Sequence, residues 1–94
     1  DGAVIDDERQ LWLAQWGAGR VAAYDPAGQF LRAVSFDAPH TSCPAFGGAD
    51  FTTLYCTTAL QDMDDAARAK YPNAGITFAA EQVAKGRAEY QVQP

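Results

Sequence analysis

The sequence predicts an all-β fold: two four-stranded antiparallel meander blades of a β-propeller, with one short helical insertion. Short apolar runs separated by turn residues recur along the chain, most clearly from Leu11 to Gly28. Similar segments repeat at a spacing near forty residues, since Ala45-Phe46 matches Ala3-Val4 and Leu54-Tyr55-Cys56 matches Leu11-Trp12-Leu13. Repeats of this length with four strands each are typical of propeller blades, which bury their faces against neighbouring blades.

The first blade is predicted to span residues 1–37. Its innermost strand opens the chain, which suggests a piece cut from something larger. In the second strand, Trp12 alternates with Leu11 and Leu13, so both faces are largely apolar and the strand should be covered on each side. Trp12 is therefore expected to be buried between the two blades. The predicted strands are Asp1–Asp6, Leu11–Trp16, Arg20–Asp25 and Phe30–Phe36.

Turns connect these strands at glycine-containing positions. Gly17-Ala18-Gly19 supplies the positive φ angles of a tight reversal, and Asp25-Pro26-Ala27-Gly28 forms the next turn. Gly17-Ala18-Gly19 lacks the strand-to-helix context of a phosphate-binding loop, so a hairpin is favoured. The alternation in Phe30–Phe36 predicts a half-exposed outer strand.

The second blade is predicted to span residues 42–94, with a helical insertion at 61–73. Asp62, Asp64 and Asp65 place acids at a helix start, and Pro72 ends the segment. The same acids resemble half of a calcium loop, but the Gly and distal Glu of that motif are missing, so helix capping is favoured. Residues 81–87 could form a turn or a helix. The predicted strands are Ser42–Phe46, Leu54–Thr58, Gly75–Ala79 and Ala88–Val92.

Composition limits the classes of function. The chain has 94 residues and a net charge of -5, with seven basic and twelve acidic residues and no basic cluster, which argues against nucleic-acid binding. Its apolar runs fall far short of the roughly 20 residues of a membrane span, and no export leader opens the chain. A cytoplasmic protein without a membrane partner is the expectation.

The two cysteines lie far apart in apolar, strand-like stretches. Two buried reduced thiols are favoured over a Cys43–Cys56 disulfide in a chain with no export signal. His40 could join them as a third zinc ligand, but the sequence offers neither a fourth ligand nor a paired-cysteine motif.

Several segments, in the same order along the chain, carry a family resemblance. They are Asp1-Gly2-Ala3, Leu11-Trp12-Leu13-Ala14, Gly19-Arg20-Val21, Tyr24-Asp25-Pro26-Ala27-Gly28, Ser42-Cys43-Pro44-Ala45-Phe46-Gly47-Gly48, Leu54-Tyr55-Cys56-Thr57-Thr58 and Ala74-Gly75-Ile76 before Phe78. Together they resemble the C-terminal third, about two blades, of the SMP-30/gluconolactonase/regucalcin-like family. The resemblance covers about residues 1–80, and the Glu81–Pro94 tail matches poorly. It implies a six-bladed propeller that hydrolyses sugar lactones with one divalent metal ion, Ca²⁺, Zn²⁺, Mn²⁺ or Mg²⁺.

Asp1 is the one functional residue that the resemblance places in this chain. It matches the Asp of the family's Asp-Gly motif, which implies a metal ligand that also serves as catalytic base. The Glu and Asn ligands lie on blades outside the chain. Without the resemblance, an Asp before a Gly is ordinarily a turn residue.

Other residues are weaker candidates. Trp12, Trp16, Tyr24 and Tyr55 could line a sugar site, although aromatic residues in strands mostly form the core between blades. Thr57, Thr58 and His40 could reach the mouth of the channel.

Two alternative functions are therefore expected. The first is the C-terminal fragment of a metal-dependent sugar-lactone hydrolase, inactive alone and not required to bind a metal by itself. The alternative is a non-catalytic binding or assembly module. In either case the open blade faces need partners, which would be the remaining blades or further copies of the chain.

Overall fold

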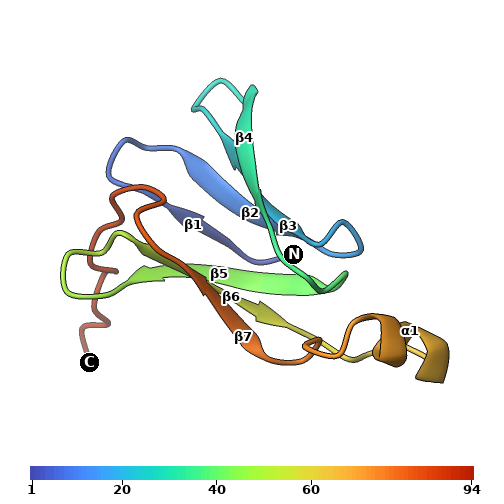
Figure 1. Cartoon of the computed structure of the whole chain (residues 1–94). Helices are drawn as coiled ribbons and strands as arrows, with labels where there is room; N and C mark the ends of the chain where they lie inside the picture. Colours follow the sequence, from blue (N-terminus) through green and yellow to red (C-terminus); the bar gives the residue numbers. More distant parts are fainter.

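The computed structural model describes all 94 residues and forms two antiparallel sheets packed face to face, with one short helix at their end (Figure 1). The first sheet has the strand order β1-β2-β3-β4 and the second the order β5-β6-β7. The all-β fold with one helix is thus confirmed. The strands are β1 (Ala3–Ile5), β2 (Leu11–Gln15), β3 (Arg20–Tyr24), β4 (Phe30–Ser35), β5 (Thr41–Gly47), β6 (Thr53–Thr58) and β7 (Thr77–Ala80).

Strand β2 lies at the centre of the packing, as its alternation predicts. Trp12 and Ala14 are fully buried and face the second sheet, whereas Leu11 and Leu13 are half-buried on the opposite, outer face. Strand β4 is largely exposed, which confirms its assignment as the outer strand. Burial of Trp12 between the two sheets is also confirmed.

The Trp12 side chain makes three kinds of contact, one with the second sheet and two within its own sheet. Its ring packs edge-on against Phe46 of β5, with 5.6 Å between centroids and an interplanar angle of 87°. The guanidinium of Arg32 lies 5.0 Å from the ring centre. The indole Nε1–H donates to Oδ2 of Asp6 at 2.9 Å. The indole is therefore fixed in orientation as well as buried.

Asp6 is a buried carboxylate that the sequence marks only as the end of a strand. It is 2% exposed, and its Oδ1 accepts hydrogen bonds from the backbone N–H groups of Glu8 and Gln10, both at 2.9 Å. Together with the bond from Trp12, these contacts satisfy both carboxylate oxygens. Asp6 thus ties the β1–β2 turn to the core.

The predicted glycine turn between β2 and β3 is confirmed. Gly17 and Gly19 have φ angles of 88° and 66°, which glycine adopts without a steric penalty. A Cβ at Gly19 would also lie 2.8 Å from the Ala38 carbonyl oxygen. The turn therefore packs directly on the connector between β4 and β5.

The insertion between β6 and β7 contains helix α1 (Asp65–Lys70). Asp64 caps it, because its side chain accepts a hydrogen bond from Ala67 N–H at 2.8 Å, so the capping interpretation is confirmed. Met63 and Ala74, on either side of the helix, pack with Ala38 in a small apolar cluster. The insertion is thereby anchored to the β4–β5 connector.

The predicted strand Ala88–Val92 does not form, so the second sheet has three strands rather than four. After β7 the chain crosses the end of both sheets instead of returning along β7. Gly86 N–H donates to Phe51 O at 2.8 Å in the β5–β6 turn, and Asp7 N–H donates to Lys85 O at 2.7 Å in the β1–β2 turn. Residues 87–94 are exposed and form no strand, and the C-terminus projects from the end of the sheets (Figure 1).

Gly86 is the position at which this tail fits most tightly. It is buried, and a Cβ there would overlap the side chain of Phe46. We expect Gly86→Ala to lower the free energy of unfolding by about 1–3 kcal/mol, the usual cost of overpacking. Urea unfolding checks this, with the exposed Ala88→Val as a matched control. Equal midpoints for Gly86→Ala and the unmodified chain would contradict the packing.

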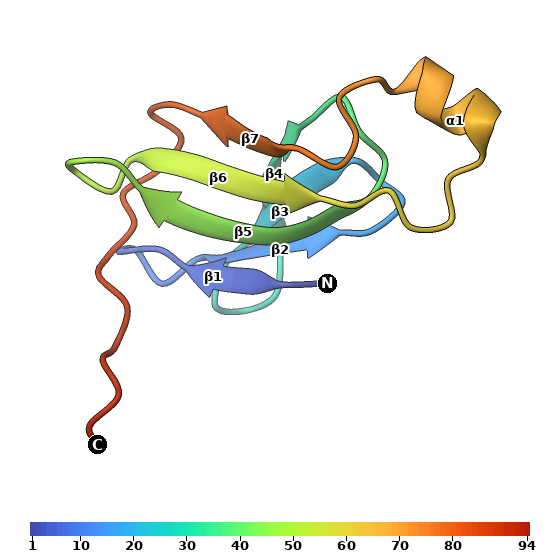
Figure 2. The ribbon, with the colours of Figure 1, turned by 90° about the horizontal axis from the view of Figure 1, so that it is seen from below.

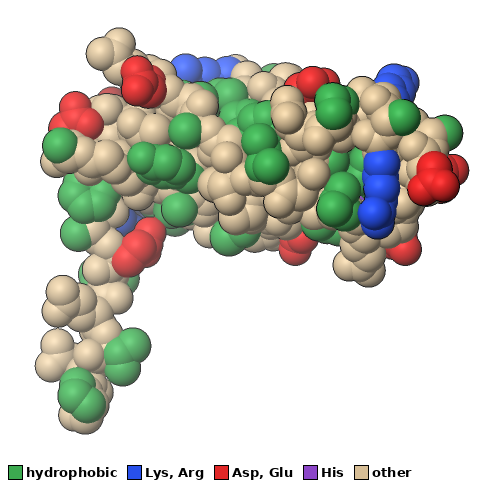
Figure 3. Space-filling view, turned by 60° about the horizontal axis from the view of Figure 1, so that its bottom comes forward, with side chains coloured by type: hydrophobic (Ala, Val, Ile, Leu, Met, Phe, Trp, Pro, Cys, Tyr) green, Lys and Arg blue, Asp and Glu red, His purple; other side chains and the backbone are tan.

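Each sheet keeps one face that the other sheet does not cover. Figure 3 shows hydrophobic side chains exposed on one side of the molecule and the tail projecting from its end. The exposed large apolar residues are Trp16, Phe30, Leu31, Tyr55, Leu60, Ile76, Tyr90 and Val92. None of the helical structure is long and apolar enough to cross a membrane.

Candidate functional site

One end of the two sheets gathers the start of β1, the β2–β3 turn, the β4–β5 connector and α1 (Figure 2). This end is called the Asp1 end. The β1–β2 and β5–β6 turns and the tail lie at the opposite end. Strands β1 and β5 run in the same direction, so both begin at the Asp1 end.

Asp1 is held in place through its backbone. Its backbone nitrogen donates to the Ala14 carbonyl oxygen of β2 at 2.5 Å, and the Ala14 N–H donates to the Gly2 carbonyl oxygen at 2.9 Å. On the other side, Gly2 N–H donates to the Ser42 carbonyl oxygen of β5 at 2.7 Å. Asp1 and Gly2 therefore lead into a strand held between β2 and β5, and the turn interpretation is wrong. Asp1 itself is exposed.

Gly2 makes this close approach possible. A Cβ at this position would lie 2.9 Å from Cys43 Sγ and 3.0 Å from the Ser42 carbonyl oxygen. Real Cβ atoms rarely come this close, so any larger residue would push β1 away from β5. The physical reason for a glycine directly after Asp1 is thus close packing of two strands.

Hydroxyl groups of the second sheet lie near this point. Ser42 Oγ and Thr57 Oγ1 are 2.8 Å apart, and Thr57 is exposed. Thr58 is instead buried, where its hydroxyl donates to the Ile76 carbonyl oxygen at 2.6 Å and accepts from Gly75 N–H at 2.9 Å. Of these predicted candidates, Thr57 is accessible and Thr58 holds the β6–β7 connection together.

The chain does not form a metal site by itself. A divalent cation such as Ca²⁺ takes six to eight oxygen ligands, and Zn²⁺ takes four ligands. Three or more His, Cys, Asp or Glu side chains do not come together anywhere in the structure. The Asp1 carboxylate has the right chemistry for one ligand of a hard cation.

The cysteines are both free thiols. Cys56 is buried in the core between the sheets, and burial raises the pKa of its thiol. Cys43 is exposed, so the expectation of two buried thiols is wrong for this residue. The register of β5 shifts between Thr41, which is buried, and Cys43, which is exposed, although two residues this far apart in a regular strand would share a face.

The four aromatic candidates occupy different environments. Trp12 is core, whereas Trp16 is 40% exposed at the Asp1 end and Tyr55 is 39% exposed on the outer face of the second sheet. Tyr24 is half-buried on the outer face of the first sheet, and its hydroxyl accepts from Gln15 Nε2 at 2.8 Å. Of these four aromatic residues, only Trp12 is buried between the two sheets of the chain, as predicted.

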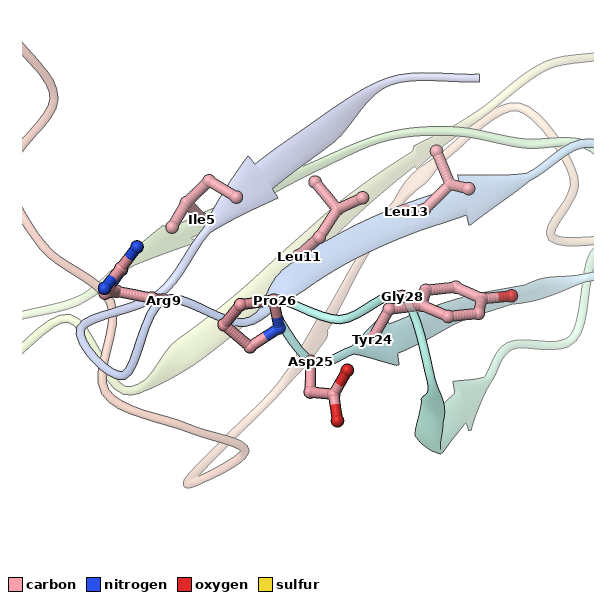
Figure 4. A pocket seen from close by; sticks show the side chains of 8 residues that line it. All are labelled: Ile5, Arg9, Leu11, Leu13, Tyr24, Asp25, Pro26 and Gly28. Carbon is pink, nitrogen blue, oxygen red and sulfur yellow. The ribbon is translucent and has the colours of Figure 1, made fainter.

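The outer face of the first sheet contains an open hollow of about 510 Å³ (Figure 4). Ile5, Leu11 and Leu13 line its base, and Tyr24 and Arg9 stand at its sides. The hollow lies away from Asp1. Its lining is largely apolar, as expected of a sheet face that packs against another sheet.

Sequence similarity shows which protein family this fold belongs to. Residues 1–60 match the model of the SMP-30/Gluconolactonase/LRE-like region. The chain belongs to this family. A sugar lactone lactonase of Rhizobium meliloti is 48% identical over 89 residues, which is 95% of the chain and 30% of that protein. Regucalcin of Danio rerio is 44% identical over 79 residues, 83% of the chain and 27% of that protein.

Two solved structures of the family have the same fold. The calcium-binding protein regucalcin of Agrobacterium tumefaciens superposes with a TM-score of 0.90 at 39% identity, over 95% of the chain and 30% of that protein. A luciferin-regenerating enzyme superposes with a TM-score of 0.82 at 29% identity, over 100% of the chain and 32% of that protein. Both are propellers, which confirms the predicted propeller fold.

The aligned range extends further along the chain than the resemblance predicted, and it covers only part of the relative. Similarity to the family extends past residue 80 into the tail, since 89 of the 94 residues align with the Rhizobium protein. The chain spans about 30% of the length of that relative.

Proposed function

We propose that the chain is the C-terminal part of a metal-dependent sugar-lactone hydrolase, with Asp1 as metal ligand and catalytic base in a six-bladed propeller. The observation that carries the proposal is the placement of Asp1. Backbone hydrogen bonds to β2 and β5 fix its position, Gly2 allows the close approach, and the carboxylate is left free at the surface. The naming of relatives as lactonases supports the reaction type.

The carboxylate suits the chemistry of lactone hydrolysis. Water adds to the lactone carbonyl carbon, the ring C–O bond breaks, and the proton lost by the water must be accepted nearby. A carboxylate fixed by its backbone can accept that proton without reorganising. A bound divalent ion, Ca²⁺, Zn²⁺, Mn²⁺ or Mg²⁺, supplies Lewis-acid chemistry in such sites. The Agrobacterium regucalcin is a calcium-binding protein, which supports a metal in the family.

The partners in this proposal are the sugar lactone and whatever covers the outer sheet faces. The remaining blades fulfil that need in a complete propeller. Further copies of the chain are the alternative, and they favour the second function, a non-catalytic binding or assembly module. The open apolar hollow on the first sheet is the observation in favour of such a module. A cytoplasmic location stays a prediction.

The activity prediction separates the two functions. The 94-residue chain alone should show no turnover of gluconolactone with Ca²⁺, Zn²⁺, Mn²⁺ or Mg²⁺, because one carboxylate cannot hold metal and substrate. A polypeptide that joins the chain to the remaining blades should be active. There, Asp1→Ala should lower kcat by about 10²–10⁴-fold, as for loss of a catalytic base.

Asp62→Ala is the matched control, since Asp62 is an exposed acid of the insertion. Turnover by the isolated chain, or a joined polypeptide that Asp1→Ala leaves unaffected, would contradict the assignment of Asp1. An inactive joined polypeptide that still folds would favour the module.

A further inference from the structure

Trp16 and His40 lie beside Asp1 at the same end of the sheets. The Asp1 nitrogen bonds to the Ala14 carbonyl oxygen, and Trp16 is two residues further along the chain from Ala14, toward the Asp1 end. The residue after Asp1 bonds to the Ser42 carbonyl oxygen, and His40 is two residues before Ser42, again toward that end. Trp16 and His40 are themselves paired in an isolated antiparallel bridge.

The two rings are stacked in parallel. Their centroids are 4.3 Å apart and their planes differ by 7°. Trp16 remains 40% exposed, while the Nδ1 atom of His40 is buried without a hydrogen-bond partner. Stacking on the indole, rather than a hydrogen bond from Nδ1, therefore positions the imidazole. The imidazole covers one side of the indole and leaves the remainder at the surface.

The backbone around this stack is rigidly held. The N–H groups of Gly17 and Gly19 both donate to the Pro39 carbonyl oxygen, at 2.9 and 3.0 Å. Thr41 Oγ1 lies 2.9 Å from the Gln15 carbonyl oxygen. Hydrogen bonds thus fix the residues on both sides of the stacked pair. An exposed indole that is held this firmly is preorganised to receive a ligand.

We propose that the exposed Trp16 indole is the surface on which the sugar ring of the substrate packs, and that His40 is a positioning residue for it. A sugar ring presents C–H groups on its faces and hydroxyl groups at its rim. The indole face complements the C–H groups. Asp1, Ser42 and Thr57 lie at the same end of the sheets and carry the oxygen atoms that hydroxyl groups at the rim of the sugar would need. The inference rests on the proposed function for the reaction, but the packing itself requires only a sugar ring.

The test uses the polypeptide that joins this chain to the remaining blades. Trp16→Ala should raise KM for gluconolactone about tenfold, the effect of one lost apolar contact in a pocket, with little change in kcat. KM for δ-valerolactone, which lacks the sugar hydroxyls and much of the ring surface, should change much less. Trp16→Tyr should recover most of the gluconolactone KM, which also keeps the test valid if Trp16→Ala folds poorly.

His40 is tested by its own pair of variants. His40→Ala should raise KM for gluconolactone by a smaller factor, and His40→Phe, which restores a stacking ring, should return it. Tyr90→Ala is the matched control, because Tyr90 is an aromatic residue of the tail that is 88% exposed. Equal changes for both lactones, or no change for either, would overturn the proposal.

Quenching of tryptophan fluorescence by gluconolactone gives a readout that does not need turnover. If the unmodified polypeptide turns over no lactone but shows quenching that Trp16→Ala abolishes, the proposed reaction is wrong and the sugar contact stands. If turnover is normal and Trp16→Ala leaves both the quenching and KM unchanged, the sugar contact is wrong and the reaction stands.

Discussion

Trp12→Ala should lower the free energy of unfolding by about 3–5 kcal/mol, the usual cost of truncating a buried large aromatic residue. The side chain is fully buried, and its loss would empty the space between the two sheets beside Phe46. It would also leave the Asp6 carboxylate buried without one of its donors. Small domains are stable by only about 5–15 kcal/mol, so a domain at the low end of this range would lose most of its stability.

One further variant separates the two causes of this loss of stability, and another serves as the control. Trp12→Phe keeps an aromatic ring but removes the N–H donor to Asp6, so it should cost about 1–3 kcal/mol. Trp16→Ala is the matched control, since the same residue type is 40% exposed there and should matter much less to stability. The measurement is urea unfolding followed by circular dichroism at one fixed protein concentration. Equal midpoints for Trp12→Ala and Trp16→Ala would show that the faces of β2 are misassigned.

The second large effect is on association. The isolated chain should sediment at a multiple of 10.1 kDa at micromolar concentration, because both sheets leave apolar side chains on their outer faces. Three copies with two sheets each would have the number of blades needed for a six-bladed ring, with the outer face of the first sheet against that of the second.

Leu13→Lys tests the surface that drives this association. Leu13 lines the hollow on the outer face of the first sheet, so a charge there should shift the chain to the monomer. Val92→Lys is the control, because Val92 is 90% exposed in the tail and belongs to neither sheet face. Sedimentation equilibrium distinguishes the species. A folded monomer of the unmodified chain would contradict the prediction.

The sequence predicts most of this fold because alternation reports burial directly. The buried face of β2 at Trp12, the glycine turn at Gly17 and the Asp64 helix cap each follow from local chemistry, and each is confirmed. The opposite face of β2, also expected to be covered, lines the open hollow instead. The features that the sequence does not predict depend on contacts between segments that are distant along the chain. Asp6 gains its role only when the indole of Trp12 turns back onto it, and the path of the tail depends on turns that are far away in sequence.

The candidate site is harder to predict than the fold. A single carboxylate has no spacing that distinguishes a ligand from a turn residue, so the proposal of Asp1 as a metal ligand comes from resemblance alone. Its backbone anchors lie 13 residues away on β2 and on the start of β5. Cys43 illustrates the same limit, because its apolar surroundings predict burial, whereas the thiol is exposed next to a register shift in β5.

The three-stranded second sheet ends on β7, and this has a consequence for how the chain associates. Strand β4, which ends the first sheet, carries Arg32 and a register irregularity, both common protections of a terminal strand. Strand β7 reads Thr-Phe-Ala-Ala, with no charge and no proline. Its outer row of backbone donors and acceptors is therefore a template for strand addition. A β-strand from another polypeptide would extend the sheet there, and without one the same template favours edge-to-edge polymerisation.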